Sequence, residues 1–296
     1  MKLLLLGKGG QVGWELQRSL APLGELITLD RHSKDFPADF SRPEQLAETV
    51  LKLRPDVIVN AAAHTAVDKA ESEPDLTRKI NAVSPGVIAE AAQYIGALMV
   101  HYSTDYVFDG SGNKPWQEND STGPLSVYGS TKLEGEQLVV RHCVKHLIFR
   151  TSWVYAARGS NFAKTMLRLA KVRDRLTVID DQFGAPTGAE LLADVTAHAI
   201  RQTLAESGKA GLYHLAAGGE ISWHGYARFV LKQAQRAGVE LKAGPEEVDA
   251  VASNAFPTPA VRPQNSRLDT VKLQTAFGLT LPHWQSGVAR MLHETI

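Results

Sequence analysis

Short apolar segments alternate with longer amphipathic segments through the first half of the chain. Continuous apolar runs, of the kind that form buried strands, cover residues 3–6, 26–29, 57–59, 98–101 and 147–149. The segments between them predict helices over residues 12–23, 74–94 and 128–141. Strands that are apolar throughout and alternate with helices are typical of a parallel sheet with helices on both faces. We therefore predict an α/β fold with a Rossmann-type, doubly wound parallel sheet.

The chain changes character after about residue 152. Residues 181–188 and 256–263 are rich in proline, glycine and polar side chains, which are signals for loops. We expect a smaller, mixed α/β C-terminal lobe that binds the substrate and closes over the sheet domain. The sheet domain is expected to comprise residues 1–152 and about 185–220, and the lobe about 153–184 and 221–296.

The composition is that of an ordinary globular chain. Of the 296 residues, 44% are hydrophobic and 22% are charged, and 32 basic side chains balance 32 acidic ones. Balanced charge argues against nucleic acid or an anionic membrane surface as a partner. Cys143 is the only cysteine, which excludes an intramolecular disulfide and a thiolate metal cluster and favours a cytoplasmic location.

Neither a signal peptide nor a membrane span is expected. The apolar run at the start is too short for the hydrophobic region of a signal peptide, because glycines interrupt it. No segment approaches the roughly 20 apolar residues that a membrane helix needs. We interpret residues 3–6 as a buried first strand.

Residues able to bind a ligand lie at the ends of several predicted strands. These residues are Gly7, Asp30, Asn60, Ser103 and Thr104. In a doubly wound sheet, ligands bind outside the carboxyl ends of the strands, near the point where the strand order reverses. We therefore expect these residues to lie along one edge of a binding site.

The first of them opens a glycine-spaced turn, Gly7-x-x-Gly10-x-x-Gly13. A pyrophosphate needs a tight turn, close approach of the backbone and the positive end of a helix. The glycines supply the first two, and a helix that begins with Gln11 and Val12 supplies the third. A glycine-rich turn without a ligand would show the same spacing. Asp30 favours the dinucleotide interpretation, because it ends the second strand where a ribose-binding carboxylate is expected.

The surroundings of Asp30 leave the choice of cofactor open. An Asp accepts from both ribose hydroxyls and repels a 2′-phosphate, which favours NADH, whereas Arg31 could pair with that phosphate. We expect both NADH and NADPH to be used. Further contacts are expected from Asp39 and Phe40 beside the adenine, and from the run that the cofactor crosses: Ala62, Ala63, His64 and Thr65. Close packing without a cofactor is the alternative for that run.

Tyr128 and Lys132 lie four residues apart, on one face of a predicted helix, and are candidates for acid–base chemistry. Lys132 is expected to lower the pKa of the phenol, which is near ~10 in water, and to bond the nicotinamide ribose. Thr104 is expected to orient the substrate oxygen. Hydride delivery to a carbonyl carbon creates an alkoxide, which Tyr128 protonates. A half-buried tyrosine with a surface lysine one turn away would give the same spacing by chance.

Taken together, these motifs resemble the dTDP-4-dehydrorhamnose reductase family of the extended short-chain dehydrogenase/reductase superfamily. The resemblance covers nearly the whole chain, in several separated blocks. The blocks are residues 7–13, 60–71, 103–108, 128–132, 150–155, 181–187 and 262–266.

The resemblance implies reduction of the 4-keto group of dTDP-6-deoxy-L-lyxo-4-hexulose to dTDP-L-rhamnose, for cell-surface polysaccharide. By position, the implied catalytic residues are Thr104, Tyr128 and Lys132, and the further substrate contacts are Asp105, Trp153 and Arg262. The Arg262 guanidinium suits phosphate geometry and would clamp the diphosphate. The alternatives are a core aromatic for Trp153 and a surface salt bridge for Arg262.

Some members of the family form homodimers bridged by Mg²⁺. The glutamates at the matching positions are Glu15, Glu190 and Glu294. Solvated surface groups are the alternative for three such scattered residues. Hydride transfer needs no metal, so this Mg²⁺ would be structural.

Three other functions compete with this interpretation, and a reductase of another nucleotide-linked keto-sugar is a fourth. Sugar-nucleotide 4,6-dehydratases need an Asp-Glu pair after the threonine, whereas Asp105-Tyr106 stands here and the base for elimination is absent. Epimerase-reductases of the GDP-fucose type use a cysteine and a histidine, and Cys143 lies away from the predicted site. A non-catalytic, NADP-binding regulatory subunit also resembles this family. The presence of Thr104, Tyr128 and Lys132 favours chemistry over that function.

Overall fold

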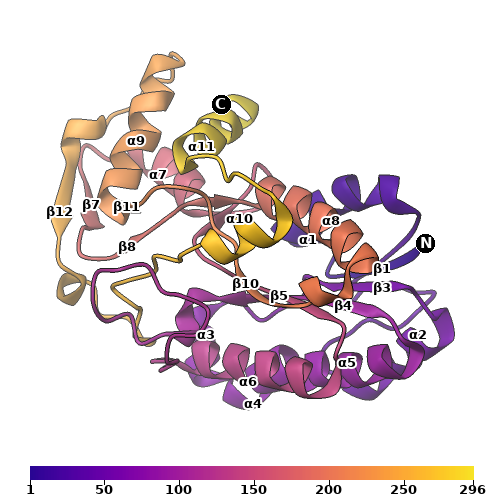
Figure 1. Cartoon of the computed structure of the whole chain (residues 1–296). Coiled ribbons are helices and arrows are strands. Elements are labelled where there is room, and N and C mark those ends of the chain that lie inside the picture. Colours follow the sequence, from indigo (N-terminus) through magenta and orange to yellow (C-terminus); the bar gives the residue numbers. More distant parts are fainter.

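Six parallel strands form the central sheet of the protein (Figure 1), which the computed structural model describes over residues 1–296. Their order is β10-β5-β4-β3-β1-β2. The strands are β1 (Lys2–Leu6), β2 (Glu25–Leu29), β3 (Val57–Asn60), β4 (Leu98–Thr104), β5 (His146–Thr151) and β10 (Gly211–His214). Since β1 pairs with β2 on one side and β3 on the other, the strand order reverses at β1. Ligand sites of doubly wound folds lie at this reversal.

The alternation of side chains along β1 explains why its sequence is apolar throughout. Leu3 and Leu5 belong to the core on one face of the sheet, whereas Leu4 and Leu6 belong to the core on the other. All four side chains are buried, and the same holds for the apolar residues of β3. A strand with helices on both sides has no solvent face that would need polar residues. The predicted doubly wound α/β fold is confirmed.

Helices cover both faces of the sheet (Figure 1). On one face lie α1 (Gln11–Leu20), α8 (Ala189–Ala205) and α10 (Val271–Phe277). On the other face lie α2 (Pro43–Leu53), α5 (Ser84–Ile95) and α6 (Val127–His142). Two short helices, α3 (Val67–Ser72) and α4 (Pro74–Arg78), and a π-helical segment, Lys79–Val83, precede α5. Single 3-10 turns cover Ala21–Leu23, Asp105–Val107, Ser207–Lys209, Pro245–Glu247 and Ser253–Ala255.

Beyond the carboxyl ends of the strands, three helices and three small sheets form the smaller lobe. The helices are α7 (Phe162–Ala170), α9 (Trp223–Arg236) and α11 (Trp284–Thr295). The strand pairs are β7 (Leu176–Ile179) with β12 (Val248–Val251), β8 (Phe183–Gly184) with β11 (Ile221–Ser222), and β6 (Val154–Tyr155) with β9 (Thr187–Gly188). Two separate hydrophobic clusters, one around Tyr226 and one around Leu231, hold this lobe together.

The structure differs from the predicted elements in two places near the site. The helix predicted over residues 74–94 is three segments, with the π-helical segment between α4 and α5. Pro85 follows this segment and has no N–H for the carbonyl of Asn81, which removes one helical hydrogen bond there. The strand predicted over residues 98–101 continues as β4 to Thr104, because Ser103 and Thr104 pair with Arg150 and Thr151 of β5.

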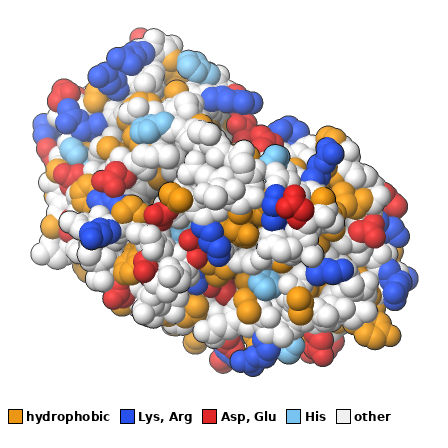
Figure 2. Space-filling view, in the orientation of Figure 1, with side chains coloured by type: hydrophobic (Ala, Val, Ile, Leu, Met, Phe, Trp, Pro, Cys, Tyr) orange, Lys and Arg blue, Asp and Glu red, His pale blue; other side chains and the backbone are white.

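The surface carries both signs of charge. Acidic and basic side chains are interspersed over the visible face, without a large field of one sign (Figure 2). None of the helices combines the length and the apolar composition that crossing a membrane requires.

Candidate active site

The turn after β1 is shaped by glycines that no other residue could replace. Gly7 has a φ of 90°, and a Cβ there would lie 2.7 Å from the amide nitrogen of Ala62, just past the end of the neighbouring strand β3. A Cβ on Gly13 would lie 2.0 Å from the carbonyl oxygen of Gly7. The first strand and helix α1 are therefore packed backbone to backbone. Gly10 precedes α1 and offers no capping side chain, so the N–H groups of the first turn remain available to an anion.

A cavity of about 450 Å³ lies against this turn. Its lining residues are Gly7, Gly9, Gly10, Asp30, Arg31, His32, Ala38, Asp39, Phe40, Ala61, Ala62, Ala63 and Ile80. Asp30 accepts a hydrogen bond from the His32 amide at 2.9 Å, and Asp39 accepts one from the Ser41 amide at 2.9 Å. The Ser41 bond lowers the pKa of Asp39, which keeps that carboxylate charged and able to accept from an amine. The cavity thus has the glycine turn at one end and two carboxylates beyond it.

A second cavity, of about 360 Å³, continues from the first along Gly10, Ala61 and Ala63. Its lining includes three further predicted cofactor residues, Gln11, Val12 and Thr65, together with Thr104, Asp105, Tyr128, Lys132 and Trp153. The structure therefore brings the three predicted catalytic side chains to one cavity, next to the glycine turn.

Helix α6 positions the phenol through its first turn. The Ser126 hydroxyl caps the helix by accepting from the Gly129 amide at 3.2 Å. A Cβ on Gly129 would lie 2.2 Å from the carbonyl oxygen of Tyr106, so glycine lets the helix start press against Asp105–Val107. The Tyr128 ring meets the Tyr106 ring edge to face, with centroids 5.4 Å apart. The order Tyr128-Gly129 is thus a packing requirement as well as a chemical one.

The protonation equilibria of Tyr128 and Lys132 are both shifted by burial. Burial raises the pKa of Tyr128 to about 12, and a hydrogen bond with the Thr104 hydroxyl opposes the rise. Burial lowers the pKa of Lys132 to about 8, against the attraction of Glu136. The expectation that Lys132 lowers the pKa of Tyr128 is therefore wrong for the protein without ligands. The physical reason is that the amine donates to the Tyr102 carbonyl at 2.6 Å and reaches the strand instead of the phenol.

Asp105 is a buried carboxyl group beside the threonine. Its side chain accepts from the Thr104 hydroxyl at 3.1 Å, while its Oδ2 atom has no hydrogen-bond partner. Burial raises the pKa of Asp105 to about 6. An unsatisfied buried oxygen at the edge of a cavity is suited to accept a hydrogen bond from a ligand hydroxyl.

A third cavity, of about 360 Å³, adjoins the second through Tyr106 and Trp153 and extends into the smaller lobe. Trp153 has a φ of 50°, an uncommon conformation for a tryptophan. Its ring stacks on Trp223 at 3.5 Å and lies over Gly184, where a Cβ would come within 2.8 Å. Arg262 lines this cavity and pairs with Asp68 of α3 at 2.7 Å. The predicted substrate contacts therefore flank one continuous space.

Two predictions are not matched by the geometry of the chain. His64 lines neither of the first two cavities. Its side chain faces Glu73 instead, with 3.7 Å between Nε2 and a carboxylate oxygen. The Asn81 side chain fixes this position by hydrogen bonds to both the amide and the carbonyl of His64. The predicted metal ligands Glu15, Glu190 and Glu294 do not form a metal site within one chain, and no group of three or more His, Cys, Asp or Glu side chains is arranged to hold a metal ion.

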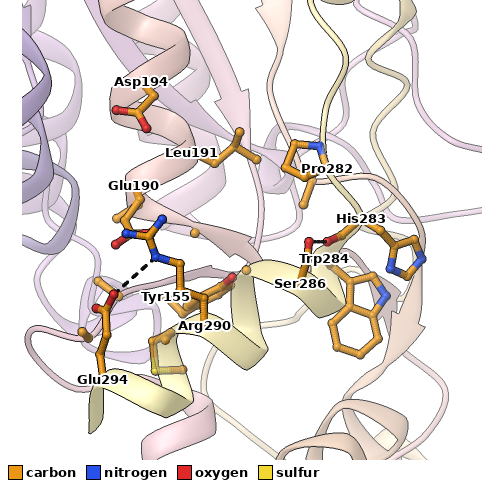
Figure 3. A pocket seen from close by; sticks show the side chains of 17 residues that line it. Tyr155, Glu190, Leu191, Asp194, Pro282, His283, Trp284, Ser286, Arg290 and Glu294 are labelled. Carbon is orange, nitrogen blue, oxygen red and sulfur yellow. Dashed lines mark hydrogen bonds and ion pairs between the residues drawn. The ribbon is translucent and has the colours of Figure 1, made fainter.

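The three glutamates nevertheless lie near one another: Glu190 and Glu294 line a separate cavity of about 270 Å³, and Glu15 is close enough for its charge to act on Glu190. Burial raises the pKa of Glu190, and the charges of Glu294 and Glu15 add to this effect. Figure 3 shows the Arg290 guanidinium between Glu190 and Glu294, at 3.6 and 3.3 Å. Glu15 pairs with Arg18 at 3.6 Å. Each of the three carboxylates thus has an arginine side chain of the same chain within ion-pair distance.

Sequence reasoning missed several polar residues behind and around the site. These are Asp68, Asn81, His101 and Tyr106, whereas Asn60 was expected at the edge of the site. Asp68 falls within the conspicuous sequence block of residues 60–71, which was a usable signal. Asn81 and His101 sit within apolar stretches, and only the pairing of β3 with β4 and the packing of α6 bring them to the site.

Comparison with known proteins agrees with this geometry. Residues 1–296 match the family described as RmlD substrate binding domain. A dTDP-4-dehydrorhamnose reductase of Shigella flexneri is 64% identical over 294 residues, which cover 99% of this chain and 98% of that protein. The chain belongs to the dTDP-4-dehydrorhamnose reductase family.

Solved structures of the family share the fold from end to end. A dTDP-4-dehydrorhamnose reductase of Clostridium acetobutylicum superposes with a TM-score of 0.88 at 36% identity and covers 99% of both chains. One of Bacillus anthracis, solved in complex with NADP, superposes with a TM-score of 0.87 at 33% identity, again over 99% of both chains.

Proposed function

We propose that the protein reduces the 4-keto group of dTDP-6-deoxy-L-lyxo-4-hexulose, with NADPH or NADH as hydride donor, to give dTDP-L-rhamnose. One observation carries the proposal: Thr104, Tyr128 and Lys132 line a cavity that continues directly into the glycine turn and the Asp30 pocket. Family membership supports the substrate, and the NADP complex of a relative supports the cofactor.

The residues of the chain fit a dinucleotide. The glycine turn and the start of α1 would hold the pyrophosphate, and Asp30 the adenosine ribose. Asp39 and Phe40 would flank the adenine, and Ala62, Ala63 and Thr65 would leave room for the cofactor to cross the sheet. When bound, the reduced nicotinamide supplies the hydride.

Protonation of the new alkoxide is the task of the chain itself. Tyr128 donates its phenolic proton to the substrate oxygen as negative charge develops there. A raised phenol pKa suits this direction, because the group stays protonated until the alkoxide, a much stronger base, appears. Thr104 orients the same oxygen, and burial of the cavity strengthens each of these hydrogen bonds.

The sugar nucleotide would extend from this cavity into the smaller lobe. Asp105 would accept from a sugar hydroxyl, and the Trp153 ring would lie beside the sugar. Arg262 would bind the diphosphate in place of its present partner Asp68, since a carboxylate and a phosphate oxygen present similar acceptors to a guanidinium.

We further propose that the protein forms a homodimer through the face that carries Glu15, Glu190 and Glu294, with Mg²⁺ as a structural bridge. The support is the gathering of the three glutamates, which a second chain would have to complete. Measuring the molecular mass in solution with Mg²⁺ and with EDTA tests it, and an unchanged monomer under both conditions rules it out.

The reaction is tested by following oxidation of NADPH and of NADH with the keto-sugar generated in situ by the upstream enzymes. Turnover with formation of dTDP-L-rhamnose is expected with both cofactors. Tight cofactor binding without oxidation would instead favour another keto-sugar substrate or the regulatory function.

A further inference from the structure

A buried imidazole stands directly behind the catalytic lysine and has no part in the reaction described so far. His101 lies on β4, between Asn60 on β3 and Lys132 on α6. The three residues are 1%, 1% and 3% exposed. The polar atoms of Asn60 and His101 therefore have to be satisfied within the protein, whereas Lys132 also lines the reaction cavity.

The hydrogen bonds of Asn60 decide which nitrogen of His101 carries the proton. The Asn60 Oδ1 atom accepts from the Ala62 amide at 3.0 Å, so the opposite side of the amide group, Nδ2, faces His101. This Nδ2 is a donor and lies 3.1 Å from His101 Nδ1, which must accept. If the Asn60 side-chain amide were flipped, its Nδ2 donor would face the N–H donor of Ala62. The network thus assigns the proton of His101 to Nε2.

That proton points at the amine of Lys132. His101 Nε2 lies 3.4 Å from Lys132 Nζ, and the amine also donates to the Tyr102 carbonyl at 2.6 Å. A protonated Lys132 would bring an N–H donor against the N–H of His101. A neutral Lys132 has a lone pair that can accept from it. The imidazole therefore discriminates between the two forms of the lysine by the direction of one hydrogen bond.

The other groups around this amine do not reverse that preference. On its own helix, Tyr128 and Glu136 lie one turn from Lys132 on either side, whereas Glu134 pairs with Arg78 and Arg141 and His142 lie in the last turn. Asp105 lies beyond the end of β4. Glu136 is held by Arg150 of β5 at 2.9 and 2.7 Å, so its charge is largely compensated. Burial and the nearby Lys132 both lower the pKa of His101, which keeps the imidazole neutral. The remaining neighbour, Asn60, does not titrate.

We propose that His101, oriented by Asn60, is a positioning residue for the reduction: its Nε2–H stabilises the neutral amine left after Lys132 passes a proton to Tyr128. This inference rests on the proposed reduction. The alkoxide takes the phenolic proton, the phenolate takes a proton from the Lys132 ammonium, and solvent returns one to the amine. Lys132 and Tyr128 lie one helical turn apart and line the same cavity. A hydroxyl group or water molecule in that cavity would carry the proton from the amine, which bonds the Tyr102 carbonyl, to the phenolate.

The tautomer is tested first in the unaltered protein. Nitrogen NMR of histidine-labelled protein, with the His101 signal identified by its loss in His101→Gln, should report a neutral ring protonated at Nε2. A ring protonated at Nδ1, or a charged ring at the working pH, would overturn the proposal. This result does not depend on turnover, so it stays informative even if the proposed substrate is wrong.

The functional consequence is tested by reversing the tautomer. In Asn60→Asp, both carboxylate oxygens accept, so His101 must carry its proton on Nδ1 and turn a lone pair to Lys132. We expect the alkaline limb of the kcat profile to move up by about one pH unit and kcat at neutral pH to fall roughly tenfold. Cofactor affinity should change less than about twofold.

His101→Gln provides the second variant, because its amide carbonyl can also accept from the ammonium, and the limb should move in the same direction. The matched control is His214→Gln, which alters a buried imidazole bonded to the Trp116 carbonyl and away from Lys132. The His214→Gln protein should be less stable, but the alkaline limb of its kcat profile should stay at the same pH as in the unaltered protein. If Asn60→Asp and His101→Gln lowered kcat equally at every pH, without moving the alkaline limb, His101 would have only a structural role and the proposal would be wrong.

Discussion

The two walls of the reaction cavity are built in different ways. The wall toward the cofactor consists of β1, the glycine turn and α1, where backbone presses on backbone within one short stretch of chain. The wall toward the smaller lobe consists of loops held by distant partners. The Asn265 side chain, for example, donates to the carbonyls of Ser111 and Lys114, about 150 residues earlier in the chain. The first wall is formed by the fold itself, whereas the second depends on a few tethers between loops.

Because the two walls are built from different parts of the chain, binding of the cofactor and binding of the nucleotide sugar should be separable. Substitutions at the glycine wall should alter cofactor binding, and substitutions in the loop wall should alter nucleotide-sugar binding. Tyr128, Thr104 and Asp105 stand at the junction of the two walls.

Tyr128→Phe should abolish most of the chemistry while both walls stay intact. Removing the phenolic proton should lower kcat by about 10²- to 10⁴-fold, the usual contribution of a positioned acid. The ring contact with Tyr106 is kept, so the cofactor Kd, measured by fluorescence titration, should stay within about twofold of the unaltered protein. A variant with full kcat would show that another group is the acid.

Asp105→Asn tests the junction through its effect on stability. The folded protein raises the pKa of Asp105 from 3.8 to about 6, so it holds the proton more tightly than the unfolded chain does. The contribution of protonated Asp105 to the free energy of unfolding is therefore complete below about pH 4 and is lost as the pH rises to about 6. Above that pH, the variant should gain up to about 3 kcal/mol in free energy of unfolding relative to the unaltered protein. Urea denaturation of both proteins across this range checks the sign, and parallel curves would contradict the burial argument.

Arg262→Ala addresses the loop wall alone. Loss of a charged donor to the diphosphate should raise the KM for the nucleotide sugar about ten- to a hundredfold, while cofactor affinity stays unchanged. Asp68→Asn is the matched variant, because it releases Arg262 from its ion pair and keeps an oxygen for the Ala260 amide. Its KM should change much less, or fall. Equal KM values for Arg262→Ala and the unaltered protein would show that Arg262 does not bind the substrate.

The same contrast explains what the sequence could predict. The strands of the main sheet and the spacing of Gly7, Gly10 and Gly13 follow from local patterns, because each requirement acts within one short segment. Tyr128 and Lys132 are similarly visible, because four residues make one helical turn. Five of the six strands and the catalytic candidates were predicted in this way.

Long-range contacts left no such signal. β10 was not foreseen, since its four residues join the sheet beside β5 only after α8 has crossed the face. The clamp of Asn81 on the His64 backbone, which turns that histidine away from the cavities, joins residues on separate elements. The approach of Lys132 to His101 likewise depends on the packing of α6 against β4. In each case the deciding partner lies on another element, and periodicity within a segment carries no information about it.

The smallest effect is expected at the cofactor wall, where Asp30 and Arg31 act in opposite directions on one ribose. Asp30→Ala should weaken NADH more than NADPH, because the carboxylate accepts from the free hydroxyls and repels a phosphate. Arg31→Ala should weaken NADPH and leave NADH nearly unchanged. The Arg31 side chain is exposed, so water and salt screen its charge. In Arg31→Ala, the ratio of kcat/KM for NADPH to kcat/KM for NADH should therefore change only about fivefold. The Arg31 effect should shrink as salt is added, whereas the Asp30 effect on NADH, which depends on direct hydrogen bonds, should persist. If both variants shifted the ratio in the same direction, the assignment of this pocket to the adenosine ribose would be wrong.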